Sequence, residues 1–590
     1  MHWEKSMWRA SGAIACGSML GLSLLLSACG SSNNNDSEMV VEQSSIEISV
    51  LGQYQSGIYL QSAAEIVSYD PVSQRAFVIN AASGEVDILD LSDPAQPTLF
   101  SFIDVSDLGG DANSVIVKNE IVAIAVEAAV RTDNGFVAFY DTAGTRLNVV
   151  GAGALPDAIT FSPDGRYVLV ANEGEPASNY SIDPEGSVTI IDLENGVLNP
   201  VVRTADFQAF NGRENELRAQ GIRIFGPGAS AAQDFEPEWV EVSADSSTAY
   251  VSLQENNAIA VIDIQTATVT DIFPLGFKDW SAAGEWSGNG LDVSRRDGIN
   301  IRNWPLYGIY QPDTIRLYEV GGETYIVTAN EGDARDYEGS VGWNANWWSE
   351  EFEVRHLQLD PVAFPDATVL QERVNMGDLR VTSTLGFVEG SCNPSLSTTE
   401  VVALDLGYDN IRDYVSAECV YEKLYAFGGR SMSIFRVTAS GLELVFDTAS
   451  QMEDTTAATY PDFFNADHRF RVPDSQFDRR SANKGPEPEG IAIGEIDGRT
   501  YAFIGLERIG GVMVYDITEP ATTEFIQYIN NRDFSLPDDP ALLTTTDLGA
   551  EGLHFIPAAA SPDSAERPLL LVGNEVSGTT TIFAIDLIYP

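Results

Sequence analysis

Acidic residues recur along the chain at two fixed places in a repeated pattern. The first place opens a short apolar segment, and the second closes the next segment, 14 to 18 residues further on except in the last repeat. The first set is Glu65, Asp157, Glu238, Asp313, Glu489 and Glu551, with Asn113 standing in once. The second set is Asn80, Glu127, Glu173, Glu255, Glu331, Glu507 and Glu575. Crowded carboxylates disfavour joint ionisation unless cations, protons or arginines offset them, so the chemistry that this pattern favours is cation binding.

Calcium is the cation that suits such a residue set best. It takes about six to eight oxygen ligands in flexible geometry, whereas the chain has few histidines and no Cys/His cluster for a softer metal. We therefore expect calcium, or another divalent cation, at a minority of Glu173, Glu238, Glu255, Asp313, Glu331, Glu489, Glu507, Glu551 and Glu575. The structural alternative is that these carboxylates cap backbone amides of repeated turns.

Basic residues are scarce, and several stand at matching loop positions. The chain has 33 Lys and Arg against 87 Asp and Glu. Arg335, Arg430, Lys484 and Arg508 are candidates for binding an anionic ligand such as a phosphate or carboxylate, which guanidinium groups hold with paired hydrogen bonds. The same groups would also serve as internal counter-ions of the acidic residues. If the protein is an enzyme, the candidate catalytic residues are Arg430, Arg480, Lys484 and His554, and no nucleophile elbow, phosphate loop or HExxH motif is present.

The segments between these residues are β-strands of an all-β fold. They alternate apolar and polar residues and are joined by turns such as Asp-Gly and Gly-Gly, which predicts antiparallel hairpins. We count eight modules, which predicts one β-propeller of seven or eight four-stranded blades, with a β-sandwich or two smaller propellers as alternatives. In a propeller the first strand of each blade lines the axis, so both acidic sets are expected around one channel mouth.

Long insertions are predicted at the same channel face. They span residues 276–311, 332–378 and 449–486. The first two contain many tryptophans, which would wall a pocket or else stabilise the rim.

The N-terminus is expected to direct export. Residues 1–28 have two basic residues followed by an apolar run and a small-residue site, which is typical of a lipoprotein signal peptide that places a lipid on Cys29. Residues 29–39 then form a flexible tether and residues 40–590 the propeller. We expect an exported protein held in the cell envelope by its lipid, with the outer membrane favoured. In that oxidising setting Cys392 and Cys419 can form a disulfide, with two buried thiols as the alternative.

The formal net charge of −54 excludes a nucleic-acid-binding surface, and a monomer is expected. The partners that we expect are the membrane, through the lipid, and a small anionic ligand or a surface glycan or protein.

Several long motifs resemble a known family. VANEGEP, FEPEWVEV, YIVTANEGDARDY, FGGRSMSIF, NKGPEPEGI and GNEVSGT together look like the choice-of-anchor I domain, a family that includes mesenchyme-specific cell surface glycoproteins and alkaline-phosphatase-like bacterial members. The resemblance implies a secreted propeller displayed through varying anchors. We expect a calcium-binding propeller that holds a ligand at its channel face, with a metal-dependent phosphatase or phosphodiesterase and a non-catalytic scaffold for protein or glycan as alternatives.

Overall fold

The computed structural model describes residues 45–337, 348–469 and 476–589. The predicted signal peptide, Cys29 and the tether lie outside the described residues, as do parts of the second and third insertions. No helix in the described ranges combines the length and the hydropathy that a membrane crossing requires.

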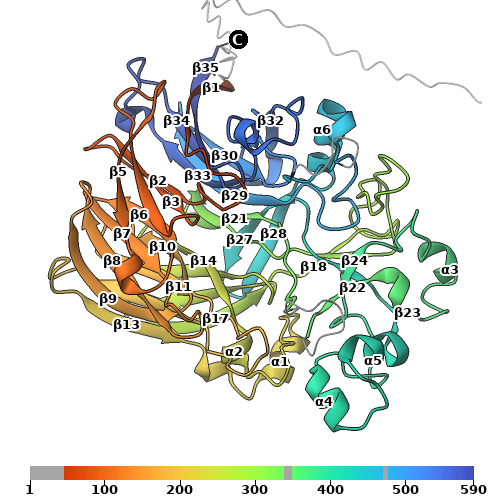
Figure 1. Ribbon diagram of the computed structural model, residues 1–590. Helices are drawn as coiled ribbons and strands as arrows, with labels where there is room; N and C mark the ends of the chain where they lie inside the picture. The colour runs from red at the N-terminus through yellow and green to blue at the C-terminus, as the bar shows by residue number, and fades with distance from the viewer. Residues whose placement is uncertain (1–44, 338–347, 470–475, 590) are drawn as a thin grey trace, which may run out of the picture. The chain divides into compact units, whose positions relative to one another are not determined.

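The described chain contains seven four-stranded antiparallel sheets (Figure 1). Blades 1 to 4 and blade 6 each consist of four consecutive strands. They are β2 (Val67–Asp70), β3 (Arg75–Asn80), β4 (Glu85–Asp90) and β5 (Thr98–Asp104); β6 (Ala112–Lys118), β7 (Ile121–Val126), β8 (Asn134–Asp141) and β9 (Arg146–Ala154); β10 (Pro156–Phe161), β11 (Tyr167–Asn172), β12 (Ser187–Asp192) and β13 (Val201–Asp206); β14 (Pro237–Val242), β15 (Thr248–Leu253), β16 (Ala258–Asp263) and β17 (Thr268–Pro274); and β29 (Pro488–Ile496), β30 (Arg499–Leu506), β31 (Val512–Asp516) and β32 (Glu524–Ile529).

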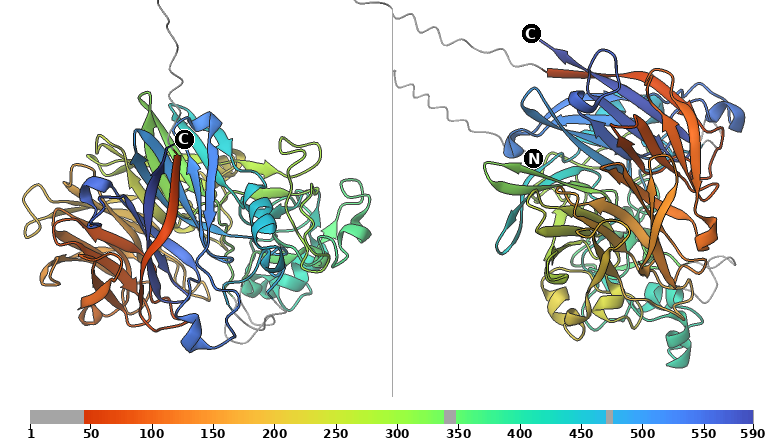
Figure 2. Two further views of the ribbon diagram at one scale, coloured as in Figure 1. Left: turned by 90° about the horizontal axis from the view of Figure 1, so that it is seen from above. Right: turned by 90° about the vertical axis from the view of Figure 1, so that its left-hand side faces the viewer.

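The first strands of the blades close a ring. Each contacts the first strand of the next blade, in the order β2, β6, β10, β14, β20 (Ile315–Val320), β29, β33 (Ala550–Ile556) and back to β2. Blade 7 joins the two ends of the domain, because β33, β34 (Leu569–Asn574) and β35 (Thr579–Ile588) are completed by β1 (Ser45–Gln55). Figure 2 shows the red strand β1 along the blue C-terminal strands. The fold is therefore the predicted single propeller, and it has seven blades.

The count of eight modules was wrong because one blade is interrupted. Blade 5 pairs β20 and β21 (Glu323–Ala329) with β27 (Met432–Thr438) and β28 (Gly441–Asp447). A long insertion between β21 and β27 makes β27 look like the start of another repeat. The second insertion thus continues to β27 rather than ending near residue 378.

The insertions that flank β20 and β21 build a region of their own, which we call the insertion region. It contains a sheet of β18 (Phe277–Asp279), β19 (Tyr307–Ile309), β26 (Tyr425–Ala426), β24 (Arg380–Thr382) and β22 (Glu351–Glu353), the pair β23 (Gln358–Leu359) and β25 (Val420–Tyr421), and the helices η3 (Val354–His356), α3 (Ala367–Leu370), α4 (Thr398–Ala403) and α5 (Ile411–Glu418). Figure 1 shows α3, α4 and α5 grouped with β22 and β23.

The described helices outside the insertion region are short. They are α1 (Glu214–Ala219), α2 (Ala231–Asp234), α6 (Gln451–Thr459), α7 (Pro540–Leu543), η1 (Ser106–Leu108), η2 (Gln208–Phe210), η4 (Pro461–Phe463), η6 (Pro520–Thr522) and η7 (Ala558–Ala560).

Most of the described tryptophans of the insertions stabilise this region. Trp280, Trp304 and Trp348 are buried in its hydrophobic core, so they do not wall the channel, while Trp343 and Trp347 lie outside the described residues. A disulfide joins Cys392 to Cys419, with the two Cα atoms 5.0 Å apart.

Candidate metal centre in the propeller channel

A bulge at the start of most inner strands positions the first set of polar residues. The strand register shifts between Pro156 and Ile159, and the corresponding shifts enclose Glu238, Glu489, Glu551 and Asn113. Because a β-bulge redirects a side chain, these residues leave the sheet pattern and turn toward the axis.

A glycine after the bulged carboxylate lets the inner strands approach one another. A Cβ atom on Gly490 would lie 1.7 Å from the Glu551 carbonyl oxygen, and one on Gly552 would lie 2.2 Å from the Glu65 carbonyl oxygen. Any larger residue at these two positions would separate neighbouring blades. The Glu-Gly pairs of NKGPEPEGI and GAEGLHF therefore combine close packing with a side chain that faces the channel.

The bulged residues surround one cavity of about 490 Å³. Every blade contributes a polar residue from the start of its inner strand: Glu65, Asn113, Asp157, Glu238, Asp313, Glu489 and Glu551. Four residues of the second set join them, namely Glu173, Glu331, Glu507 and Glu575. Asn80, Glu127 and Glu255 do not line the cavity. All of the first set and four residues of the second set therefore converge on one cavity.

The paired sector consists of Glu331 and Glu507, which line one side of the cavity, of Glu487, which is grouped with them but does not line it, and of their cationic partners. Lys484 Nζ lies 2.6 Å from Glu331 Oε1 and 3.3 Å from Glu487 Oε2. Arg508 bridges Glu487 and Glu507 at 2.7 Å each, and Arg480 pairs with Glu487. Burial by itself raises the pKa of Glu487, but Arg480, Arg508 and Lys484 outweigh it and hold the pKa below its ordinary value. Internal cations therefore hold Glu487 and Glu507 ionised, whereas burial raises the pKa of Glu331 to about 7 despite its contact with Lys484.

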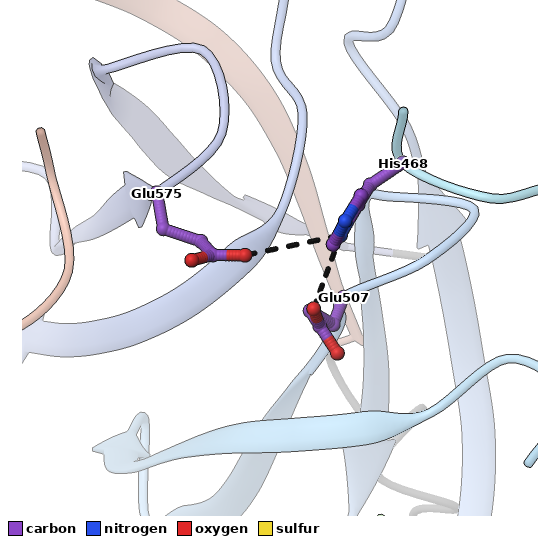
Figure 3. A group of neighbouring side chains, drawn as sticks. All are labelled: His468, Glu507 and Glu575. Atoms are coloured by element: carbon purple, nitrogen blue, oxygen red, sulfur yellow. Dashed lines mark ion pairs between the residues drawn. The ribbon is translucent and has the colours of Figure 1, made fainter. Parts of the chain in front are cut away.

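His468 adds a nitrogen ligand beside the paired sector. Its Nδ1 atom lies 3.0 Å from Glu507 Oε1 and 3.8 Å from Glu575 Oε1 (Figure 3). Arg508 is also within hydrogen-bond distance of the imidazole, at 2.9 Å from Nδ1. Since a guanidinium already occupies this corner, a metal ion there would meet a like charge.

The open sector, which consists of Asp157, Glu173 and Glu238, has no such compensation. Ligand oxygens of these three side chains lie within 4.8 Å of one another. Within the described part of the chain, no Lys, Arg or His side chain forms an ion pair with any of them. Arg131 lines the same cavity and lowers the pKa values of Asp157 and Glu173, but its ion pairs are with Glu127 at 3.4 Å and with Glu175 at 3.1 Å.

The three carboxyl groups of the open sector have pKa values above their ordinary range. Burial raises the pKa of Asp157 to about 7. Burial, together with repulsion from Glu175 and Asp157, raises the pKa of Glu173 well above its ordinary value. Burial and repulsion from Glu173 and Glu255 do the same to Glu238. The raised pKa values of these three carboxyl groups contrast with the lowered pKa of Glu487 in the paired sector.

Two further groups of carboxylates complete the ring. Glu65, Glu551 and Glu575 can also offer oxygens within 4.8 Å of one another, and so can Asp313, Glu331 and Glu489. Burial and repulsion from Glu575 raise the pKa of Glu65 to about 8. The Oε2 atom of Glu489 is buried and has no hydrogen-bond partner among the described residues.

Some candidate residues lie away from the cavity. Arg430 is buried and donates hydrogen bonds to Glu453 Oε1 at 2.7 Å and to three backbone carbonyl groups. His554 follows Glu551 on β33 but does not line the cavity, and burial lowers its pKa to about 4. Arg480 and Lys484 meet at Glu487, and Arg430 binds the backbone of the loop between them, whereas His554 is not part of this group.

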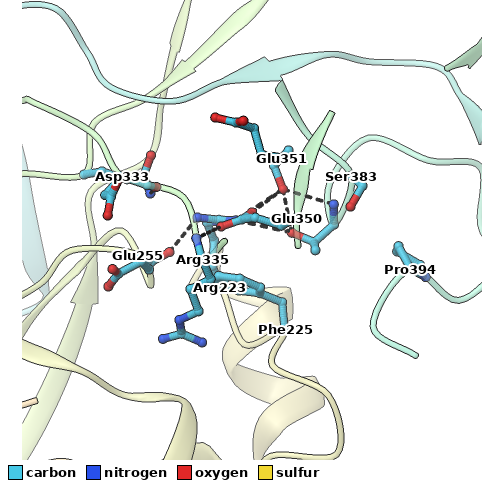
Figure 4. Close-up of polar contacts among 12 residues, drawn as sticks. Arg223, Phe225, Glu255, Asp333, Arg335, Glu350, Glu351, Ser383 and Pro394 are labelled. Atoms are coloured by element: carbon cyan, nitrogen blue, oxygen red, sulfur yellow. Dashed lines mark hydrogen bonds and ion pairs between the residues drawn. The ribbon is translucent and has the colours of Figure 1, made fainter. Parts of the chain in front are cut away.

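Arg335 is a structural link rather than a cavity residue. Its guanidinium donates to Asp234 Oδ1 at 2.8 Å and to Glu236 Oε2 at 2.9 Å. Figure 4 shows Arg335 near Arg223, whose guanidinium binds the Glu255 carbonyl oxygen and the Glu350 carboxylate. These contacts join blade 4 to the insertion region.

Several residues around the cavity could not be selected from the sequence. Arg131, Gln254 and Asp333 line it, and His468 lies beside Glu507. The third insertion supplies both His468 and Lys484, of which the sequence analysis selected only Lys484. Nothing in the spacing of His468 relative to Glu507 or Glu575 indicates their contact.

The fold and this channel define the class as a seven-bladed propeller with an acidic axial cavity. The profile of the choice-of-anchor I domain matches residues 65–520, and the chain belongs to this family. Gigasin-3a of Magallana gigas is 31% identical over 173 residues, 28% of this chain and 58% of that protein. The mesenchyme-specific cell surface glycoprotein of Strongylocentrotus purpuratus is 27% identical over 352 residues, 55% of this chain and 41% of that protein. The chain thus matches less than two thirds of the length of either relative.

Solved structures resemble the chain more distantly. The Kuenenia stuttgartiensis hydrazine synthase aligns with 91% of this chain and 99% of its own at a TM-score of 0.41 and 12% identity. The β-propeller domain of Myceliophteria thermophila Cps50 (Swd1) aligns over the same shares at a TM-score of 0.41 and 9% identity.

Proposed function

We propose that this protein is a cell-envelope propeller that binds a calcium ion in the open sector, through Asp157, Glu173 and Glu238. The observation that carries the proposal is that three partly buried carboxylates share one corner of the cavity and form no ion pair with a cation among the described residues. A divalent cation would remove both the burial cost and the mutual repulsion that raise their pKa values.

The choice of calcium rests on the donor atoms. The three side chains offer only oxygen, and calcium accepts about six to eight oxygen ligands with tolerant geometry. Magnesium requires stricter octahedral geometry and retains its water more strongly. The nitrogen of His468 is beside the paired sector, where Arg508 competes with a metal.

The ligand of the loaded cavity is proposed to be anionic. Three side chains would leave some coordination positions of a bound calcium ion unfilled, and oxygen atoms of a carboxylate or phosphate ligand would occupy these positions. Lys484, Arg480 and Arg508 are engaged by carboxylates, which favours their role as internal counter-ions over a catalytic one.

We further propose that the domain is exported and held by a lipid on Cys29. The support is the sequence pattern around that cysteine and the similarity to a cell surface glycoprotein. Mass spectrometry of the membrane fraction would detect a diacylated N-terminal Cys29, and an unmodified N-terminus would contradict the anchor.

Isothermal titration calorimetry on the mature domain tests the calcium site. We expect saturable calcium binding that Glu238→Gln weakens at least about tenfold, because a neutral amide replaces a ligand charge. Glu47→Gln, on the exposed face of β1, is the matched control and should bind as the parent does. No calcium binding by the chelator-treated parent, or equal binding by Glu238→Gln, would contradict the proposal. Hydrolysis of 4-nitrophenyl phosphate in the same preparations would show whether the loaded cavity also turns over a phosphate ester.

A further inference from the structure

Four arginine side chains of the insertion region converge on one carboxylate. Arg296 Nε lies 2.8 Å from Asp378 Oδ2, Arg373 Nε lies 2.7 Å from Asp378 Oδ1, and Arg295 Nε lies 3.5 Å from Asp378 Oδ2. Arg355 pairs with Asp378 Oδ1 as well. We call these four residues the arginine cluster. None of them lines the channel cavity, so the cluster is independent of the candidate calcium site.

The arginine cluster carries more positive charge than its partners cancel. Asp378 is fully buried, and Glu353 is the one other carboxylate within ion-pair distance of the cluster in the described ranges, through Arg355. Four guanidinium groups therefore face two carboxylates. Although burial raises the pKa of Asp378, Arg373, Arg296 and Arg355 lower it to about 2, so the carboxylate does not lose its charge at neutral pH. A local excess of positive charge is notable in a chain of net charge −54.

The geometry leaves hydrogen-bond donors unused. Arg295, Arg296 and Arg373 each approach Asp378 with the Nε atom. Their terminal Nη atoms have no acceptor among the residues that the structure describes. These three side chains are 40%, 39% and 50% exposed. Asp378 thus fixes the inner edge of each guanidinium, while the outer edges are open to solvent.

Backbone contacts hold the loops of the cluster together. The Ser294 hydroxyl donates to the Arg373 carbonyl oxygen at 3.2 Å and accepts from the Arg296 amide at 3.2 Å. The Arg355 amide donates to the Gly377 carbonyl oxygen at 3.1 Å. The cluster is assembled before any ligand arrives, which lowers the entropic cost of binding.

We propose that the arginine cluster binds sulfate or phosphate ester groups carried on a polysaccharide chain. A tetrahedral oxyanion presents several acceptors to guanidinium forks, and charge-assisted bonds of this kind are about twice as strong as neutral ones. A single polysaccharide chain is narrow enough to contact the arginine cluster while its other anionic groups stay away from the acidic surface of the protein. An anionic membrane would meet the strongly acidic remainder across its whole face, so a lipid headgroup fits less well.

Fluorescence anisotropy with labelled dextran sulfate, in EDTA and low salt, tests the proposal without involving the calcium site. We expect the double variant Arg296→Gln/Arg373→Gln to weaken binding at least about tenfold. The control Arg213→Gln/Arg436→Gln removes the same charge from two exposed ion pairs elsewhere and should change binding by less than about twofold. Equal weakening by both double variants would mean that net charge alone acts, and it would overturn the proposal.

Further arms identify the source of the oxyanion. Neutral dextran should not bind, and inorganic phosphate should compete at high concentration. Preferential binding to phosphatidylglycerol vesicles over dextran sulfate would also overturn the proposal. Arg295→Gln, which removes the side chain most loosely held by Asp378, keeps the test valid if the double variant unfolds. It should weaken binding about threefold while the melting temperature stays unchanged, and unchanged binding would contradict the assignment.

Discussion

The open sector and the paired sector use the same side chains with opposite electrostatic results. Both consist of carboxylates grouped at one cavity, buried in the paired sector and partly buried in the open sector. In the paired sector, Glu487 is held ionised by Arg480, Lys484 and Arg508. In the open sector, burial and repulsion between carboxylates raise the pKa values of Glu173 and Glu238, and neither forms an ion pair with a cation in the described ranges. The repeat sets where a carboxylate lies, and the loops set whether it is charged.

The origin of the cations explains the difference. Arg480 and Lys484 come from the third insertion, which precedes blade 6, and Arg508 follows the second strand of that blade. Residues 207–236 also precede an inner strand, that of blade 4, but their arginines Arg213, Arg218 and Arg223 do not line the cavity. A bound ion in the open sector would do there what the third insertion does on the other side of the cavity.

The largest expected effect separates the sectors by stability. Glu487→Gln leaves three cationic groups without their shared partner, so the free energy of unfolding should fall by about 3 to 5 kcal/mol. Urea denaturation monitored by tryptophan fluorescence would measure it. A loss below about 1 kcal/mol would mean that the paired sector is not an internal salt-bridge network.

A pH titration in EDTA tests the open sector next. The folded-state pKa of Asp157, about 7, exceeds that of the unfolded chain. The folded state therefore binds more protons, so the free energy of unfolding should fall between about pH 4 and pH 7, by roughly 2 kcal/mol. Saturating calcium should abolish that decline. A stability that rises over the same range in EDTA would contradict the raised pKa values.

Glu238→Gln should affect ion binding and stability in opposite directions. Without calcium, the substitution removes a like charge, and the free energy of unfolding at pH 8 should rise by about 1 kcal/mol. The stabilisation that calcium gives should be lost at the same time. Melting curves with and without calcium measure both, and a variant that is less stable in EDTA would indicate a structural role for Glu238.

The smallest expected effect concerns Arg131. Its side chain is 60% exposed and lies nearest to the open sector, so Arg131→Gln should tighten calcium binding about twofold to threefold, because solvent screens most of its charge. Calorimetry at low salt would measure this change. Weaker binding in the variant would indicate that Arg131 positions Glu127 or Glu175 for the ion.

The propeller fold and the ring of polar residues at the starts of the inner strands could be predicted from the sequence, because both follow from local repeats. Glu489-Gly490 and Glu551-Gly552 encode a strand start, a bulge and a close approach in two residues each. Contacts between segments far apart in the sequence are not encoded in this way. His468 reaches Glu507, and β27 returns to β21 after an insertion that hides the link.

The alternation of apolar residues and the spacing of the carboxylates determined, by themselves, a propeller with an acidic channel. Only the tertiary structure decided that there are seven blades, that Arg430 is buried away from the cavity, and that cations neutralise one sector alone. The physical reason is that strand pairing and side-chain direction depend on neighbouring residues, whereas the pairing of buried charges depends on which loops meet in space.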